Sequence, residues 1–235
     1  MSPPGPVRAL LFDLDGTLVD TETHTDEAIG VVVARYGVHG FALPPAETRG
    51  RTWAHVAQAI RAQAPIDAPA AALAAELLEY WDAATARVRP IPGAPEALRA
   101  AAERGLKLAV VSSSPRAVIA RLLGRLGVAG LVAPEARIGG DDVRRGKPDP
   151  EGFLRAARAL GVGPHEALVF EDSRAGLEAA RAAGMRSMFV TCVATDVAEL
   201  TALATASFTD YRRLPASLWD ELAAGAVGLA GRTFT

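Results

Sequence analysis

Two aspartates stand two positions apart, directly after an apolar run near the start of the chain. Asp13 and Asp15 follow the run 7–12 and precede Gly16. In an extended backbone, side chains two positions apart project to the same side, so both carboxylates would lie at the end of a strand. Such a pair favours a hard divalent cation with oxygen ligands, and Mg²⁺ fits best. An Asp-rich turn is the other interpretation, because Asp-Gly is a common turn dipeptide.

Hydroxyl groups follow a second apolar run. Ser112, Ser113 and Ser114 come after residues 106–111 and stand before Pro115, which is typical of a first helical turn. Hydroxyl and backbone N–H groups at the start of a helix suit a phosphate group. Routine N-capping explains the same residues and is preferred if they are taken alone.

A lysine and two acids stand at two further junctions. Lys147 lies just before a predicted helix, in a chain with 25 basic residues among which the other lysine is Lys107. Its compact ammonium can approach a carboxylate and a phosphate together, whereas a solvated surface lysine is the alternative. Glu171 and Asp172 end the apolar run 167–170, where they could complete a metal site. Capping of the next helix by the second acid is the alternative.

All four features fall where a predicted strand or loop meets a helix. The sequence predicts strands at 7–12, 106–111, 136–138, 167–170 and 186–190, and helices that end at glycines at 95–104, 115–126, 150–160 and 173–183. This alternation predicts an α/β fold with a doubly wound, Rossmann-like parallel sheet that helices cover on both faces. Ligands bind such sheets beyond the carboxyl ends of the strands, so the four features should share one edge.

The stretch from 21 to 89 interrupts this alternation. It is helical in pattern without a convincing strand, with predicted helices at 25–36, 52–63 and 69–87. We expect an inserted all-helical cap domain over 21–89 and a core domain made of 1–20 and 90–235. Elsewhere we expect a loose tail at 1–6, a helix at 218–224 and, after it, a Gly/Ala-rich end of uncertain order.

Composition narrows the class of partner. Half of the 235 residues are apolar and the formal net charge is -2, which argues against disorder and against binding to nucleic acid or an anionic membrane. No apolar run approaches the roughly 18 residues that a membrane span needs. The single cysteine, Cys192, excludes an intramolecular disulfide, and a secretory signal is lacking. We expect a soluble cytoplasmic protein, a monomer or weak dimer, that binds a small molecule.

The four segments, in this order and with a helical insertion after the first, resemble those of the haloacid dehalogenase-like hydrolase superfamily. The resemblance covers nearly the whole chain and points to the branch with a small helical C1-type cap. The first motif, residues 12–18, is highly specific. Glu171, Asp172 and Ser173, followed by Gly176, are similar to the motif of beta-phosphoglucomutase-like and phosphoglycolate phosphatase-like members.

The resemblance implies covalent catalysis. Asp13 matches the nucleophile and Asp15 the general acid/base, which protonates the leaving oxygen and later activates water against an aspartyl phosphate. Ser112 matches the phosphate-binding hydroxyl, with Ser113 beside it, and Lys147 matches the cation that steadies the nucleophile and the phosphoryl oxygens. The implied activity is Mg²⁺-dependent hydrolysis of a small phosphorylated metabolite, a phosphomonoester such as a sugar phosphate or phosphoglycolate.

The resemblance also implies a metal site and limits the reaction. Asp172, with help from Glu171, would bind Mg²⁺ together with Asp13 and the backbone carbonyl of Asp15. The acid at position 15 argues against a true haloacid dehalogenase, since the resemblance implies that those members lack it. A non-catalytic, receiver-like module phosphorylated on Asp13 is a hypothesis of another class, but such a module needs no cap.

A cap should close over the site, exclude water and determine substrate choice. In beta-phosphoglucomutase-like members a histidine follows the acid of the Asp-Thr pair by five positions. Counted from Asp20, that position is Thr25 here, and His24 stands one position early. On a helix one position is a rotation of about 100°. This disfavours the phosphomutase, the nearest rival function, and leaves His24 as a simple core or surface histidine.

Other cap residues have two interpretations. Arg49 and Arg51 flank a glycine and could bind an anionic substrate, although solvated arginines explain them equally well. Trp53, Tyr80 and Trp81 are expected to form the core of the cap in preference to a platform that stacks on a sugar.

Overall fold

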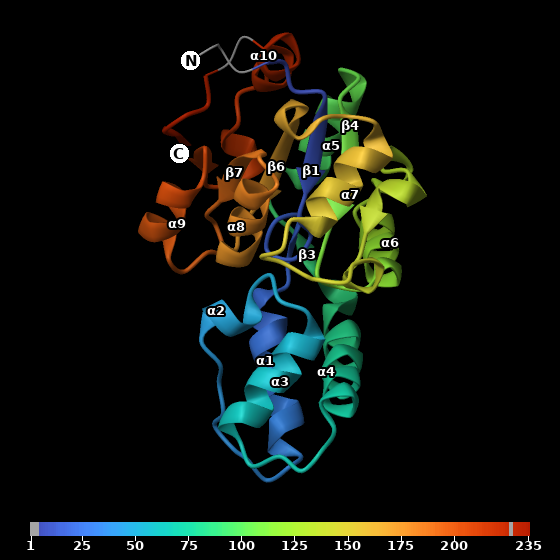
Figure 1. Cartoon of the computed structure of the whole chain (residues 1–235), viewed down its shortest axis with the longest axis vertical. Coiled ribbons are helices and arrows are strands. Elements are labelled where there is room, and N and C mark those ends of the chain that lie inside the picture. The colour runs from blue at the N-terminus through green and yellow to red at the C-terminus, as the bar shows by residue number, and fades with distance from the viewer. Residues whose placement is uncertain (1–4, 226–227) are drawn as a thin grey trace.

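The computed structural model describes residues 5–225 and 228–235, and its largest element is a seven-stranded parallel sheet (Figure 1). The strand order is β5-β4-β1-β6-β7-β8-β9. The strands are β1 (Ala9–Phe12), β4 (Lys107–Val111), β5 (Arg137–Ile138), β6 (Ala167–Glu171), β7 (Arg186–Val190), β8 (Ala206–Phe208) and β9 (Arg232–Phe234). Residues 1–4, most of the predicted loose tail, lie outside the described residues.

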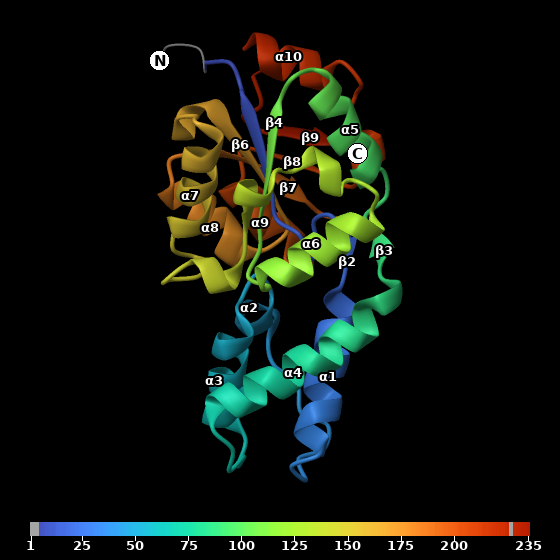
Figure 2. The same ribbon diagram turned by 90° about the vertical axis from the view of Figure 1, so that its right-hand side faces the viewer.

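Helices cover both faces of the sheet. Figure 2 shows α5 (Ala94–Glu103) and α6 (Arg116–Arg125) on one face, and α7 (Glu151–Leu160) and α8 (Arg174–Ala182) on the other. β1 and β6 are therefore buried along their whole length, which is why they are continuous apolar runs in the sequence. Glycines with positive φ follow these four helices, as predicted, at Gly105, Gly127, Gly161 and Gly184. The doubly wound α/β fold is confirmed.

The position of β1 between β4 and β6 sets the location of the site. From β1 the chain moves to β4 and β5 on one side of the sheet, and it then returns to β6 on the other side. α5, on the connection from β1 to β4, and α8, which follows β6, consequently lie on opposite faces. The carboxyl ends of these two strands form the switch point at which doubly wound sheets bind ligands.

The insertion after β1 is a helical bundle below the carboxyl ends of the strands (Figure 1). Its helices are α1 (Glu22–Ala34), α2 (Pro45–Thr48), α3 (Trp53–Gln63) and α4 (Ala70–Ala84). They bury an apolar cluster of their own, which includes Val32, Ile60 and Leu77. Two short antiparallel strands, β2 (Val19–Asp20) and β3 (Arg89–Pro90), pair where the chain leaves the sheet and where it returns.

The C-terminal region is more regular than the sequence indicated. α10 (Leu218–Ala224) agrees with the predicted helix, but α9 (Val197–Leu203), β8 and β9 were not predicted. Both strands have three residues, too few for a recognisable apolar alternation, and β9 gains its regularity by pairing with β8. In the described part of the chain, no helix combines the length and apolarity needed to cross a membrane.

Candidate active site

The first aspartate is held at the switch point. Asp13 follows β1, and its backbone N–H donates to the carbonyl of Phe170 at 2.9 Å, which continues the pairing of β1 with β6. Asp13 as a whole residue is 3% exposed. The turn that follows requires glycine, because Gly16 has a φ of +80° and a Cβ there would collide with the carboxylate of Asp172. The first motif, which contains Gly16, and the last motif, which contains Asp172, are therefore in contact at this turn.

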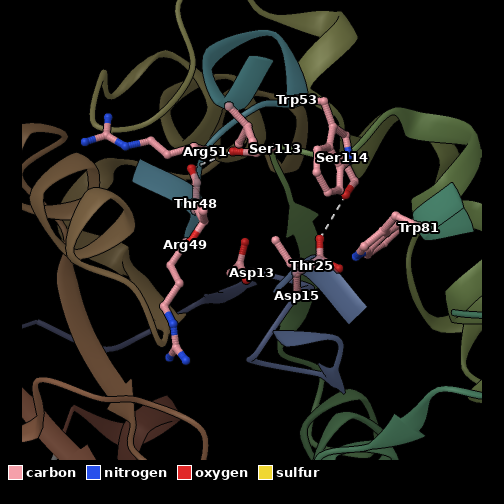
Figure 3. A pocket seen from close by; sticks show the side chains of 12 residues that line it. Asp13, Asp15, Thr25, Thr48, Arg49, Arg51, Trp53, Trp81, Ser113 and Ser114 are labelled. Carbon is pink, nitrogen blue, oxygen red and sulfur yellow. Dashed lines mark hydrogen bonds between the residues drawn. The ribbon is translucent and has the colours of Figure 1, made fainter. Parts of the chain in front are cut away.

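The carboxylate of Asp15 accepts hydrogen bonds from three hydroxyl groups. Thr21 donates to Oδ1 at 3.0 Å, while Ser112 and Ser114 donate to Oδ2 at 3.0 and 2.9 Å. Figure 3 shows the bond from Ser114. Burial raises the pKa of Asp15, and the three hydroxyls partly oppose that rise. Sequence reasoning did not predict that Thr21 or Ser114 contacts Asp15. The Ser114 contact forms because β1 and β4 lie side by side, whereas Thr21 lies only six positions from Asp15.

Lys147 joins the ends of β1 and β6. Its Nζ lies 2.5 Å from Oδ1 of Asp13 and also donates to Oε1 of Glu171. Burial alone would lower the pKa of Lys147, but the two carboxylates raise it above the usual lysine range. Burial also raises the pKa of Asp13, and the ammonium opposes this effect. The buried positive charge thus balances part of the negative charge at the switch point.

The second carboxylate oxygen of Glu171 is held by the start of α8. Oε2 accepts from the backbone N–H groups of Asp172 and Ser173, both at 3.1 Å, and from the Ser173 hydroxyl at 2.9 Å. A Cβ at Gly176 would overlap the Glu171 carboxylate. The glycine three positions after Ser173 therefore leaves room for a buried acid.

Three buried acids have the chemistry of a metal site. Asp13, Glu171 and Asp172 each offer a carboxylate oxygen, and these atoms lie within 4.8 Å of one another. Thr17 donates to Oδ1 of Asp172 at 3.2 Å. A buried set of oxygen donors with excess negative charge fits a hard divalent cation. Asp15 is predicted to bind the metal through its backbone carbonyl, which leaves its side chain to the three hydroxyls.

A cavity lies between the switch point and the helical insertion (Figure 3). We call it the central cavity. The sheet side contributes Asp13, Asp15, Ser113 and Ser114, and the insertion contributes Thr25, Thr48, Arg49, Gly50, Arg51, Trp53, Val56 and Trp81.

Three predicted binding residues, which line the central cavity, also connect the insertion to the sheet domain. The Ser113 hydroxyl donates to the carbonyl of Gly50 at 2.8 Å. Arg49 Nη1 donates to the carbonyl of Val193 at 2.6 Å, and Arg51 Nη1 donates to that of Lys147 at 3.3 Å. Figure 3 shows both arginine side chains extending away from Asp13.

The predicted aromatic residues of the cap differ in where they lie. Trp53 and Trp81 form an edge contact with ring centroids 6.1 Å apart, and both pack against apolar neighbours. They also line the central cavity, so packing is not their only position. The hydroxyl of Tyr80 donates to Glu27 at 2.8 Å, outside the cavity lining.

The fold and the site define a class: a doubly wound α/β protein with buried carboxylates, a buried lysine and a candidate divalent-metal site at the switch point of a parallel sheet. The family model of the haloacid dehalogenase-like hydrolases matches residues 7–184, and the chain belongs to that family.

Two of the relatives carry the names of phosphatases, and a third is known from a structure with phosphate. The chain is 38% identical over 186 residues to validoxylamine A 7'-phosphate phosphatase of Streptomyces hygroscopicus subsp. limoneus, covering 76% of this chain and 83% of that protein. It is 30% identical over 212 residues to phosphoglycolate phosphatase of Escherichia coli, covering 79% and 81%. The solved structure of CbbY from Rhodobacter sphaeroides in complex with phosphate has a TM-score of 0.68 and 29% identity, covering 78% and 86%.

Proposed function

We propose that the protein is a Mg²⁺-dependent phosphatase that hydrolyses a small phosphomonoester, a sugar phosphate or a phosphoglycolate-like compound, through an aspartyl phosphate on Asp13. The observation that carries this proposal is the buried contact of Asp13 with Lys147, next to the carboxylates of Glu171 and Asp172. The phosphatase names of the relatives support the reaction class.

The first displacement uses both aspartates. Asp13 forms a bond to phosphorus while the bond from phosphorus to the ester oxygen breaks. Asp15 donates its proton to the leaving oxygen, so the product leaves as an alcohol. A carboxyl group whose pKa is raised by burial suits this step, because more of it is protonated near neutral pH.

The second displacement restores the enzyme. Water attacks the phosphorus of the aspartyl phosphate, the bond to Asp13 breaks and inorganic phosphate is released. Asp15, now ionised, accepts the proton of the water. Two moderate barriers replace one high barrier, which is the advantage of covalent catalysis.

Positive charge must face the phosphoryl oxygens throughout. Lys147 supplies one such charge, and Mg²⁺ held by Asp13, Asp172 and Glu171 would supply another. We assign the phosphate-binding hydroxyl to Ser112, whose proton would turn from Oδ2 of Asp15 to a phosphoryl oxygen when substrate binds. Ser113 would act through its backbone N–H, unless its hydroxyl leaves the carbonyl of Gly50.

The residue at one position of α1 favours hydrolysis over the phosphomutase reaction. Thr25 lines the central cavity. His24 does not line it, and its ring nitrogen instead lies 3.5 Å from the Thr23 hydroxyl. The cavity therefore receives a hydroxyl where the mutase-like members carry an imidazole. A mutase would also need a bisphosphate activator and would return an isomer.

We also propose that residues 21–89 act as a cap domain that moves about the β2–β3 pair. The central cavity between this segment and the sheet supports the proposal, since a receiver-like module has no need of an enclosed site. A cytoplasmic location and a monomeric or weakly dimeric state remain predictions from the sequence.

The test is inorganic phosphate release from a panel of phosphomonoesters, with Mg²⁺ or with EDTA. We expect Mg²⁺-dependent release by the parent protein and by Asp67→Asn, which alters an exposed aspartate. Asp13→Asn should abolish it. Release that persists in Asp13→Asn would refute the proposed nucleophile, and an isomer formed without phosphate would indicate a phosphomutase.

A further inference from the structure

One polar group in the central cavity has no assigned use. Trp81 lies near the end of α4 and is 1% exposed, and its indole Nε1 is buried without a hydrogen-bond partner in the described part of the chain. An indole N–H can only donate. Native proteins leave few buried donors unpaired, so each such donor requires an explanation.

The direction of the Trp81 indole explains why its N–H has no partner within the protein. Figure 3 shows the Trp81 nitrogen facing the part of the central cavity where Asp15 and Thr25 lie. In the proposed reaction Asp15 protonates the leaving oxygen, so this space is where the leaving group must lie. The unpaired N–H therefore faces the space that the carbon skeleton of the substrate would occupy.

The charges around the cavity restrict that skeleton. Arg49 and Arg51 are the cations among the described lining residues, and each donates to a backbone carbonyl at the junction of insertion and sheet. Lys147 is held between Asp13 and Glu171. A carboxylate on the leaving group would enter a site rich in acids without a cation directed at it, and burying such an unpaired charge is highly unfavourable.

The remaining walls suit a hydroxylated skeleton. Trp53 and Val56 offer apolar surface for C–H groups. The hydroxyl of Thr25 donates to the carbonyl of Thr21 at 3.4 Å, which leaves its oxygen able to accept from a ligand hydroxyl. Trp81 thus offers the leaving group a donor, Thr25 offers it an acceptor, and the apolar side chains offer it a wall.

We propose that the leaving group is a neutral polyol or sugar and that the indole N–H of Trp81 binds one of its hydroxyl oxygens. This inference rests on the proposed phosphatase activity and selects among its candidate esters. Trp81 is then a specificity-determining residue, which pairs with the substrate where sequence reasoning expected only packing.

The test compares kcat and KM for three esters: sorbitol 6-phosphate, phosphoglycolate and phenyl phosphate, which has no hydroxyl group. We expect the parent protein to have a kcat/KM for sorbitol 6-phosphate at least about tenfold above that for phosphoglycolate. Trp81→Phe keeps a ring and deletes the N–H. It should raise KM for sorbitol 6-phosphate about five- to tenfold and leave phenyl phosphate within about twofold.

Trp219→Phe is the matched control, because it deletes a buried indole in α10, away from the central cavity. It should leave the ratios among the three esters unchanged. An equal loss on all three esters in Trp81→Phe would assign Trp81 a structural role and overturn the inference. So would a parent protein that prefers phosphoglycolate. Mg²⁺-dependent release from phenyl phosphate keeps the proposed function in either case, whereas no release from any ester overturns both.

Discussion

The ammonium of Lys147 lies 2.5 Å from the carboxylate of Asp13, a residue 134 positions earlier in the chain, and it also contacts Glu171. The three side chains come from the ends of β1 and β6 and from the loop before α7. Their positions depend on the strand order, since β1 and β6 are neighbours only because the chain reverses its direction across the sheet. The carboxylate of Asp13, the proposed nucleophile, is therefore paired with the ammonium of Lys147 before any substrate binds.

Removal of this ammonium should destabilise the protein strongly. Lys147→Met leaves the Asp13 and Glu171 carboxylates buried without their partner, and breaking a buried ion pair lowers the free energy of unfolding by about 3–5 kcal/mol. Urea unfolding in EDTA measures the loss. Mg²⁺ should restore more stability to this variant than to the parent protein, because the cation can replace part of the missing charge.

Lys107→Met is the control for this change. Lys107 is exposed and donates to the carbonyl of Leu160, so its loss should change the free energy of unfolding by no more than about 1 kcal/mol. Phosphate release should fall by about 10²–10³-fold in Lys147→Met alone. Equal stability of the two variants in EDTA would contradict the account of a buried, charge-balanced site.

Two glycine-to-alanine substitutions in helices distinguish the effect of helix propensity on stability from the effect of a steric clash with Glu171. Gly176→Ala places a methyl group against the Glu171 carboxylate and should lower the free energy of unfolding by about 1–3 kcal/mol. Gly124→Ala, in α6, meets no atom within 4 Å and should raise it by about 0.5–1 kcal/mol. Thermal unfolding measures both. Stabilisation by both changes would show that Glu171 can move without penalty.

An ion pair outside the site should give a defined dependence on pH. Burial would raise the pKa of Asp142, but Arg116, which donates to both carboxylate oxygens at 2.9 Å, and the N–H of Gly139 hold it below its usual range. A carboxyl with a lowered folded-state pKa stabilises the fold above the unfolded pKa of about 4, and this contribution is lost as the pH falls through the folded value.

Asp142→Asn should therefore destabilise the protein by about 1 kcal/mol at pH 7, a value reduced by the partial exposure of Arg116. The difference from the parent protein should shrink as the pH falls below about 4. Asp220→Asn, which alters an exposed partner of Arg104, should change stability by less than about 0.5 kcal/mol. A constant difference for Asp142→Asn between pH 7 and pH 3 would be inconsistent with this pairing.

The contact of Ser113 with Gly50 should hold the insertion against the sheet domain. Ser113→Ala removes the hydroxyl and keeps the backbone N–H, so we expect faster amide exchange in residues 49–52. The inhibition constant of inorganic phosphate should change by less than about twofold. A weaker phosphate inhibition with unchanged exchange would instead assign the hydroxyl to the phosphate.

Sequence reasoning located the chemical groups whose signals are local. The acids that end β1 and β6 follow apolar runs, so their position at one sheet edge could be predicted from residues 7–18 and 167–172. Lys147 was noticeable because lysine is rare in this chain. The contacts of Ser112 and Ser114 with Asp15 and the direction of Trp81 could not be predicted, because they depend on segments far apart in the sequence. β8 and β9 were missed for a related reason, since pairing, not composition, makes them strands.

The central claim is that Asp13 carries the phosphoryl group between the two displacements. Asp15→Asn should slow the attack of water, and p-nitrophenyl phosphate has a leaving group that needs little proton donation. After this variant is mixed with the ester and Mg²⁺ and quenched with acid, peptide mass spectrometry should find one phosphoryl group on Asp13. Phosphate release by the parent protein without any phosphoryl group on Asp13 in this experiment, or with the group on another residue, would contradict the account.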